Sequence, residues 1–197
     1  MSLLDKNVQI EYNSSKYYKD YKMKKIAIQL VHPNYEESRV NKALIQAVEN
    51  LENVTVHRLY EKYPNHKIDV EAEQKILLEN DVVLFQFPLY WLSSPSLLKE
   101  WFDATLTYNF AFGEQYLLEG KKFAIATSAG SGTKEYSETG SNKLTVEEFL
   151  NPFIGTANYT KMSYQNPFIT YETFVLSDEQ LEVASRSYVK YIQELAS

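Results

Sequence analysis

VLFQFPLYWLSSPSLLKEWFD, residues 83–103, joins a strongly apolar run to the start of a helix. The run Val82 to Phe87 is almost entirely apolar, which is typical of a strand covered on both faces. After this strand, apolar residues at helical spacing predict the buried face of a helix: Leu97, Leu98, Trp101 and Phe102. Ser94-Pro95 predicts the start of this helix, because serine suits the N-cap and proline the first helical position. The aromatic residues between strand and helix indicate a flat, apolar ligand.

Further short apolar runs flank this stretch and predict four more strands. They lie at residues 24–31, 54–60 and 121–128, and within MSYQNPFITYE, residues 162–172. Helical spacing and capping residues predict helices between the strands. These helices follow Ser38, cover residues 70–79, follow Thr145 with its partner Glu148, and follow Ser177 with its partner Gln180.

This alternation predicts an α/β fold with right-handed βαβ connections, a parallel sheet and helices on both faces. Five strands in fewer than 180 residues fit the flavodoxin-like order 2-1-3-4-5. We expect residues 1–22, which are polar and rich in tyrosine, to be an N-terminal extension, and residues 23–197 to form the domain.

Composition restricts the possible classes of function. The chain of 197 residues contains no cysteine, which excludes disulfides, thiolate metal sites and cysteine nucleophiles. A formal net charge of −6 argues against a nucleic-acid partner, which calls for a basic face. No apolar run approaches the roughly 18 residues of a membrane span, and the first residues lack a signal-peptide core. The expected location is therefore the cytoplasm.

Ligands of open parallel sheets bind beyond the carboxyl ends of the strands, where the strand order reverses. The loops after the first, third and fourth strands should border this crevice. They begin at His32, Pro88 and Ala129. In the first loop, residues Ser38-Arg39-Val40-Asn41 form a helix N-terminus, which is a natural phosphate site. The alternative is that Ser38 is only an N-cap and His32 an exposed loop residue.

The second and third loops suit a planar ring system. Tyr90 and Trp91 offer flat faces beside a rigid turn, although both could instead cover the core beneath the following helix. The third loop has small residues directly after the strand, which allow close backbone approach, and then Tyr136, whose hydroxyl could meet a substrate. Taken alone, it could equally be an ordinary surface loop.

Other sites find little support. The chain has no GxGxxG, GxxxxGK[ST] or GxSxG motif. His32, His57 and His66 show no metal-ligand spacing, so no metal site is expected. The acidic residues are spread over predicted helices as a solvated face.

Three segments resemble the NAD(P)H:quinone oxidoreductase family of flavoproteins. They are FPLYWLSSPSLLKEWFDATLTYNFAFG (87–113), EYSETGSNKLTVEEFLNPF (135–153) and NPFITYE (166–172). His32-Pro33 with residues 38–41 is similar to the phosphate loop of the family's bacterial branch, which includes flavin-containing ancillary subunits of glutathione-gated potassium efflux systems. The resemblance covers roughly residues 24–195.

The resemblance implies a non-covalent flavin, FMN or alternatively FAD, with NAD(P)H as hydride donor and a quinone or similar acceptor. It places the flavin phosphate at His32 and Ser38, Arg39, Val40 and Asn41. The isoalloxazine edge would meet Pro88, Leu89, Tyr90, Trp91 and Leu92, and the ring and ribityl chain would border Thr127, Ser128, Ala129 and Gly130. Tyr136 matches the tyrosine of the family's hydride-transfer site, and Asn142 stands where animal quinone reductases have a histidine.

The Tyr90-Trp91 loop and the long loop after the fourth strand should shape a substrate pocket, which disfavours a plain flavodoxin-like electron carrier. Two other functions remain open. One is a quinone or azo-type reductase. The other is a regulatory ancillary subunit of a membrane potassium efflux antiporter. The resemblance also implies a homodimer in which both subunits line each active site. The excess of aromatic residues, with 16 tyrosines and 10 phenylalanines, is consistent with such pairing.

Overall fold

The computed structural model describes residues 23–197, so the predicted extension at 1–22 lies outside the described residues. Its strands are β1 (Ile26–Leu30), β2 (Val54–Arg58), β3 (Val82–Pro88), β4 (Lys122–Ser128), β5 (Ser163–Tyr164) and β6 (Phe168–Thr170). Its helices are α1 (Arg39–Val48), α2 (Leu59–Lys62), α3 (Val70–Glu79), α4 (Ser96–Thr105), α5 (Val146–Phe149), α6 (Asn151–Tyr159) and α7 (Asp178–Leu195), and a single 3₁₀ turn covers Tyr35–Glu37.

The strands form one parallel sheet in the order β2-β1-β3-β4-β5, which confirms the predicted topology. The predicted fifth strand is divided into two short pieces, because β5 and β6 both pair with β4 at different registers. Pro167 lies between the two pieces, and it has no N–H group to donate to the ladder.

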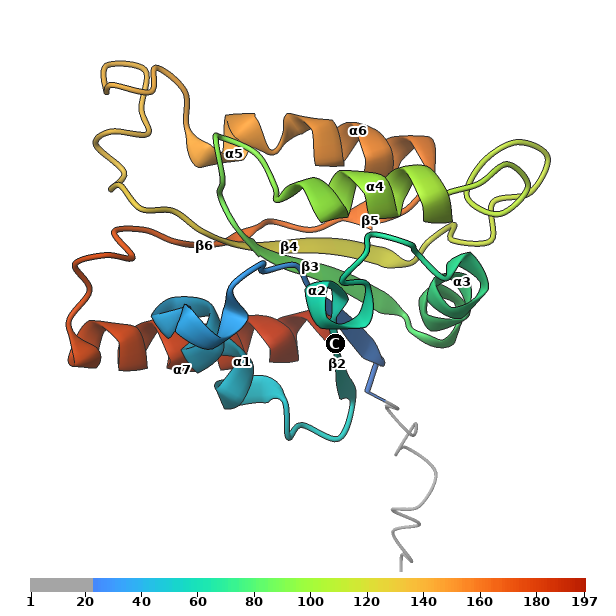
Figure 1. Cartoon of the computed structure of the whole chain (residues 1–197), viewed down its shortest axis with the longest axis horizontal. Helices are drawn as coiled ribbons and strands as arrows, with labels where there is room; N and C mark the ends of the chain where they lie inside the picture. Colours follow the sequence, from blue (N-terminus) through green and yellow to red (C-terminus); the bar gives the residue numbers. More distant parts are fainter. Residues whose placement is uncertain (1–22) are drawn as a thin grey trace, which may run out of the picture.

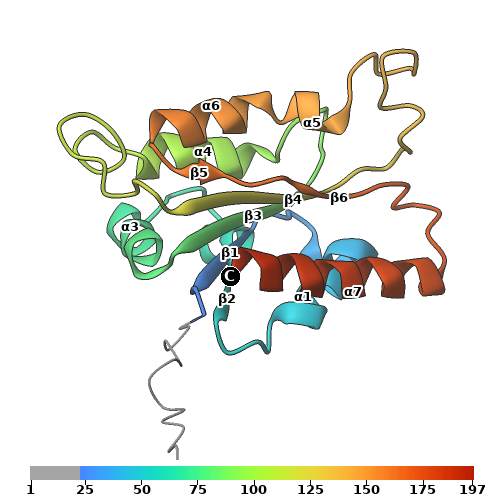
Figure 2. The same ribbon diagram turned by 180° about the vertical axis from the view of Figure 1, so that it is seen from behind.

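Helices cover both faces of the sheet. Figures 1 and 2 show α1 and α7 on one side of the strands and α4, α5 and α6 on the other. The alternating side chains of β3 divide accordingly: Val82 and Leu84 join the core under α1 and α7, whereas Val83, Phe85 and Phe87 join the core under α4 and α6. No described helix has the length and apolar character needed to cross a bilayer.

Most predicted helix starts are confirmed. Ser38 caps α1 by accepting a hydrogen bond from the backbone N–H of Asn41. Complete capping boxes open α5 at Thr145 and α7 at Ser177. The predicted start of α4 was wrong by one position: Pro95 has an extended ψ of 149° and is itself the N-cap, so the helix begins at Ser96. The second strand was also predicted too long, because Leu59 and Tyr60 already belong to α2.

Two glutamines interrupt the otherwise apolar central strands, one on each face. Gln29 of β1 points to the α3 side, where its Nε2 donates to the buried carboxylate of Glu73 at 3.1 Å. Gln86 of β3 points to the α1 and α7 side, where it contacts Asn41 and Tyr188. Both side chains are fully buried. The two polar atoms of Gln86 have partners within the protein, whereas the Oε1 atom of Gln29 has none among the described residues.

Candidate functional site at the carboxyl ends of the strands

A cavity of about 580 Å³ lies at the carboxyl ends of β1, β3 and β4, where the strand order reverses. This volume is within the range of small-molecule and cofactor sites. Eleven of the predicted site residues line it: His32, Ser38, Arg39, Val40, Asn41, Pro88, Leu89, Tyr90, Ser128, Gly130 and Tyr136. The structure thus brings the three predicted loops together at one site.

One end of the cavity is built by the N-terminus of α1. The first N–H groups of a helix have no partner within it, and the helix dipole favours negative charge there. The Ser38 Oγ atom accepts hydrogen bonds from the backbone N–H and from the Nδ2 atom of Asn41, at 3.3 and 3.2 Å. Both of its acceptor positions are therefore occupied, which leaves the hydroxyl hydrogen free to be donated.

A second hydroxyl comes from the end of β4. Ser128 Oγ accepts from Asn41 Nδ2 at 3.0 Å, so this hydroxyl also retains a hydrogen to donate. Asn41 is buried and contacts both serines, and it thereby joins the start of α1 to the end of β4. The arrangement presents donors from two elements to the same end of the cavity.

His32 adds a neutral donor. Its Nδ1 atom accepts the backbone N–H of Asn34 at 3.1 Å, so the proton of the neutral ring resides on Nε2. Burial lowers the pKa of His32, which favours the neutral imidazole at pH 7. The ring also packs edge-on against Tyr90, at 6.3 Å between centroids. The imidazole is therefore oriented by contacts on two sides.

Small residues and aromatic rings also line the cavity. A Cβ atom added to Gly130 would lie 2.5 Å from the Phe174 ring, so a larger residue there would displace this exposed ring from the loop backbone. Tyr136 packs edge-on against Phe149 and at an angle to Tyr171, with centroids 6.3 and 6.2 Å away. Burial raises the pKa of Tyr136, which keeps its hydroxyl protonated as a donor.

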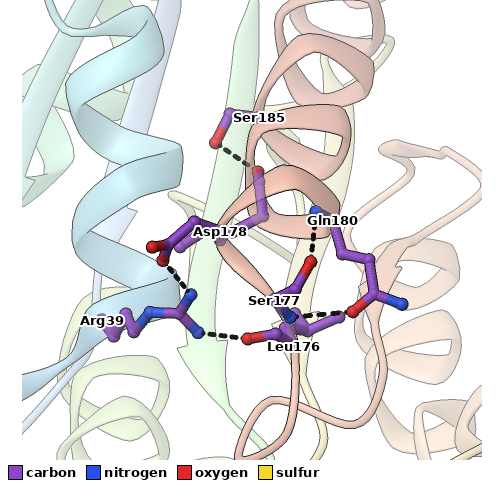
Figure 3. A network of polar contacts seen from close by, with 7 residues as sticks. Arg39, Leu176, Ser177, Asp178, Gln180 and Ser185 are labelled. Atoms are coloured by element: carbon purple, nitrogen blue, oxygen red, sulfur yellow. Dashed lines mark hydrogen bonds and ion pairs between the residues drawn. The ribbon is translucent and has the colours of Figure 1, made fainter.

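The Arg39 guanidinium turns toward α7, as Figure 3 shows. Its nitrogens donate to the carbonyl of Leu176 at 2.7 Å and to the carboxylate of Asp178 at 2.6 Å. Arg39 was predicted to hold a phosphate, but its charge is here engaged at the start of α7. These contacts join the start of α1 to the segment just after Thr173 and Phe174, both of which line the cavity.

The turn at residues 90–93 is closed by its own backbone. The N–H of Tyr90 donates to the carbonyl of Ser93 at 2.8 Å, and the N–H of Ser93 returns a bond of 3.0 Å. Trp91 and Leu92, at the tip, have φ values of 47° and 63°, which bulky side chains rarely adopt. Trp91 is 98% exposed, so the alternative that it covers the core was wrong. A strained turn that presents an indole to solvent is typical of a functional position.

Five predicted residues do not line the cavity: Trp91, Leu92, Thr127, Ala129 and Asn142. The Thr127 hydroxyl instead donates to the carbonyl of Phe87 at 3.0 Å. Ala129 continues the pairing beyond β4, since its N–H donates to the carbonyl of Thr170 at 2.8 Å. Asn142 closes its own loop through a backbone bond to the carbonyl of Glu135 at 3.0 Å.

The structure adds five lining residues that the sequence analysis missed: Asn34, Glu37, Ser131, Thr173 and Phe174. Thr173 and Phe174 follow β6, the neighbour of β4 in the sheet. Loops after adjacent parallel strands converge at one edge of the sheet, so the position of these two residues directly after the last strand is the sequence signal for them.

The donor set fits a phosphate-bearing planar cofactor. Two serine hydroxyls, a neutral imidazole and the first N–H groups of α1 lie at one end. The remaining lining includes Gly130, Tyr136 and Phe174. The cavity thus combines donors suited to a phosphate with apolar and aromatic lining suited to a ring system, which is the combination that a flavin requires.

Comparison with known proteins agrees with this geometry. The sequence profile of the flavodoxin-like fold family matches residues 24–192. General stress protein 14 of Bacillus subtilis is 42% identical over 171 residues, which cover 86% of this chain and 98% of that protein. The uncharacterised NAD(P)H oxidoreductase YdeQ of the same organism is 42% identical over 172 residues, 87% of each protein. The glutathione-regulated potassium-efflux system ancillary protein KefG of Yersinia enterocolitica is 37% identical over 86% of this chain and 92% of that protein.

Solved structures give the same result. General stress protein 14 of Treponema denticola, in complex with FMN, superposes with a TM-score of 0.83 at 39% identity over 87% of this chain and 99% of that one. An NADPH-quinone reductase of P. pentosaceus superposes with a TM-score of 0.79 at 35% identity over 88% of this chain and 98% of that one. The chain therefore belongs to the flavodoxin-like fold family that includes these NAD(P)H oxidoreductases and potassium-efflux ancillary proteins.

Proposed function

We propose that the chain is a flavin-dependent NAD(P)H oxidoreductase that passes a hydride to a quinone or similar acceptor. The observation that supports it most strongly is the cavity at the reversal point of the sheet, whose lining combines hydroxyl and imidazole donors with aromatic side chains. Relatives named for NAD(P)H oxidation and quinone reduction, at 35% identity or more, favour the same activity.

In this proposal the phosphate of the flavin binds at the N-terminus of α1. Ser38 and Ser128 donate through their hydroxyls, His32 donates through Nε2, and the first N–H groups of the helix complete the site. The Arg39 side chain contributes indirectly. Its contacts with Leu176 and Asp178 position the segment that follows Phe174, which lines the cavity.

The isoalloxazine ring is assigned to the space bordered by Pro88, Leu89 and Tyr90 on one side and by Gly130 and Tyr136 on the other. When bound, a flavin supplies the redox chemistry, since it accepts a hydride from a nicotinamide and donates it to a two-electron acceptor. The chain contributes binding and orientation. Tyr136, kept protonated by its burial, is positioned to donate a hydrogen bond to an acceptor oxygen.

We infer FMN rather than FAD, because the cavity has one anion-binding end, built on a single helix N-terminus. The FMN complex of general stress protein 14 from Treponema denticola favours the same choice. The test is to purify the protein, denature it and identify the released flavin by chromatography. FMN at about one per chain is expected. Release of FAD would overturn the choice of nucleotide, and a chain that binds no flavin even after reconstitution would overturn the proposal.

The reaction itself is tested by steady-state oxidation of NADH and NADPH with and without a soluble quinone. We expect oxidation of the nicotinamide to depend on the quinone and on bound flavin. If the reconstituted protein passes electrons to no quinone, the assigned reaction is wrong even where the cofactor is right.

We also infer a homodimer. A groove of about 730 Å³ runs between α4 and α6, and its apolar lining includes Phe102, Leu106, Phe112, Phe153 and Tyr159. Phe102, Leu106 and Phe112 are partly exposed and Phe153 is buried, so the groove offers an apolar, aromatic-rich floor of the kind found at protein interfaces. Tyr159, with 64% of its surface exposed, lies on the rim.

Light scattering at micromolar concentration should give the dimer mass, and the substitution Tyr159→Arg should lower the measured mass toward that of the monomer. A monomer mass for the unchanged protein contradicts this inference.

A second candidate function is association with a membrane potassium efflux antiporter. The similarity to KefG over 86% of this chain favours it. Co-purification of an antiporter with the tagged chain would support it, and efflux that is unaltered by deletion of the chain would count against it. The two functions are compatible, because an ancillary subunit could retain the oxidoreductase site.

A further inference from the structure

A buried chain of hydrogen bonds connects α7 to the start of α1 through β3. The Tyr188 hydroxyl donates to Gln86 Oε1 at 2.7 Å. Gln86 Nε2 donates to the backbone carbonyl and to the Oδ1 atom of Asn41, each at 3.2 Å. Asn41 Nδ2 in turn donates to the two serine hydroxyls of the anion-binding end. Tyr188 and Gln86 are fully buried, and Asn41 is 2% exposed.

The orientation of this chain of bonds is fixed by one group that cannot be reversed. A carboxamide or a hydroxyl can exchange donor and acceptor roles, but the backbone carbonyl of Asn41 can only accept. The amide nitrogen of Gln86 must therefore face Asn41, and its oxygen must face Tyr188. It follows that the oxygen of the Asn41 side chain faces Gln86, and that its nitrogen faces Ser38 and Ser128.

The orientation of Asn41 decides what the two serines can offer. While its nitrogen donates to them, Ser38 and Ser128 act as acceptors toward Asn41 and keep their own hydrogens for a ligand. If the carboxamide turned over, its oxygen would take up a serine hydrogen, and the cavity would lose a donor. A turned carboxamide therefore weakens anion binding without removing any residue from the cavity wall.

We propose that Gln86 is a positioning residue that sets the donor polarity of the phosphate site through Asn41, and that Tyr188 holds the Gln86 side chain in place through the hydrogen bond to its Oε1 atom. Neither residue lines the cavity. The inference rests on the proposed function, because it assigns the anion of this site to the flavin phosphate. It predicts a specific effect: the loss of either residue should weaken binding of the phosphate but not binding of the ring.

The experiment compares FMN with riboflavin, which has the same ring without the phosphate. The full-length apoprotein is titrated with each, and binding is followed by the change in flavin fluorescence. The unchanged protein should bind FMN much more tightly than riboflavin. Gln86→Leu should lower FMN affinity by about tenfold, equivalent to about 1.4 kcal/mol, and leave riboflavin affinity unchanged. Tyr188→Phe, a milder substitution, should lower it about threefold, in line with the loss of one buried hydrogen bond.

Tyr63→Phe is the matched control. It also removes one buried tyrosine hydroxyl, which here donates to Glu73 at 2.6 Å on the opposite face of the sheet. It should leave the ratio of FMN to riboflavin affinity unchanged, whatever its effect on stability. If Gln86→Leu does not fold, Tyr188→Phe decides the question.

The outcomes separate this inference from the proposed function. An apoprotein that binds neither ligand contradicts the proposed function. If the unchanged apoprotein binds FMN tightly, but Tyr188→Phe and Gln86→Leu have the same ratio of FMN to riboflavin affinity as the unchanged protein, only the positioning role is overturned. Equal affinity of the unchanged protein for FMN and riboflavin overturns it too, because the phosphate would then make no contribution to binding.

Discussion

The indole nitrogen of Trp101 donates a hydrogen bond of 2.9 Å to the carboxylate of Glu73, and neither side chain is exposed to solvent. The same carboxylate accepts from Gln29 at 3.1 Å, from Tyr63 at 2.6 Å and from Lys62 at 2.7 Å. Four donors thus converge on one buried acidic residue of α3; they come from β1, from α2 and the residue that follows it, and from α4. A buried charge is tolerated only when it is paired and hydrogen-bonded in this way.

Glu73→Gln should destabilise the protein by about 3 kcal/mol, because an amide replaces one acceptor oxygen by a donor and leaves the Lys62 charge without its partner. Urea unfolding followed by far-ultraviolet circular dichroism measures the change. Glu79→Gln makes the same substitution on the same helix, at an exposed pair with Lys75 that is 3.8 Å apart. It should change the free energy of unfolding by less than about 0.5 kcal/mol. Equal effects of the two substitutions would contradict the role of Glu73.

Stability should fall between pH 10 and pH 12. Burial, together with the hydrogen bond to Glu73, raises the pKa of Tyr63 to about 12. Above pH 10 the unfolded chain loses this proton while the folded protein keeps it, so the free energy of unfolding decreases as the pH rises. Tyr63→Phe should reduce the slope by up to about 1.4 kcal/mol per pH unit. Urea titrations at several pH values measure it, and an unaltered slope would show that Tyr63 does not contribute.

Tyr136→Phe should slow turnover about tenfold, which corresponds to about 1.4 kcal/mol of barrier. The substitution removes the hydroxyl proposed to donate to the acceptor, while the ring keeps its packing against Phe149 and Tyr171. Flavin content should not change. Stopped-flow measurement of flavin reduction and reoxidation assigns the effect to one half-reaction. Wild-type rates in both would mean that Tyr136 is only a wall residue.

Trp91→Ala should change the free energy of unfolding by less than about 0.5 kcal/mol, because the side chain is 98% exposed and stabilises no core. Its position on the strained turn beside Tyr90 predicts a role in holding the acceptor. We therefore expect the KM for a quinone to rise severalfold while flavin binding remains unchanged. An unaltered KM would assign the strained turn to another purpose, such as subunit pairing.

The parts of the structure that could be predicted are those with a local signal. Apolar runs and capping residues such as Ser38 and Ser177 indicated the strands and helices, because strand burial and helix capping depend on residues close in sequence. The order of the strands then followed from chain topology, and the rule for ligand sites in parallel sheets brought three loops to one cavity.

The contacts that could not be predicted join residues far apart in sequence. Tyr188 and Gln86 are separated by 102 positions, and Arg39 and Asp178 by 139. Nothing next to Arg39 indicates that its charge binds the start of α7 rather than a ligand. Similarly, the exposure of Trp91 depends on positive φ values at the turn, and the sequence contains no glycine there to suggest them.

The two tryptophans of the chain occupy opposite environments, and this gives the protein two optical reporters. Trp101 is fully buried and Trp91 is almost fully in water. Emission from Trp101 should therefore lie at shorter wavelength and respond to unfolding, whereas emission from Trp91 should lie at longer wavelength and respond to events at the turn. A quencher dissolved in the buffer would reduce the emission of Trp91 and leave the emission of the buried Trp101 unchanged. Acceptor binding or subunit pairing could then be followed in the intact protein without any added label.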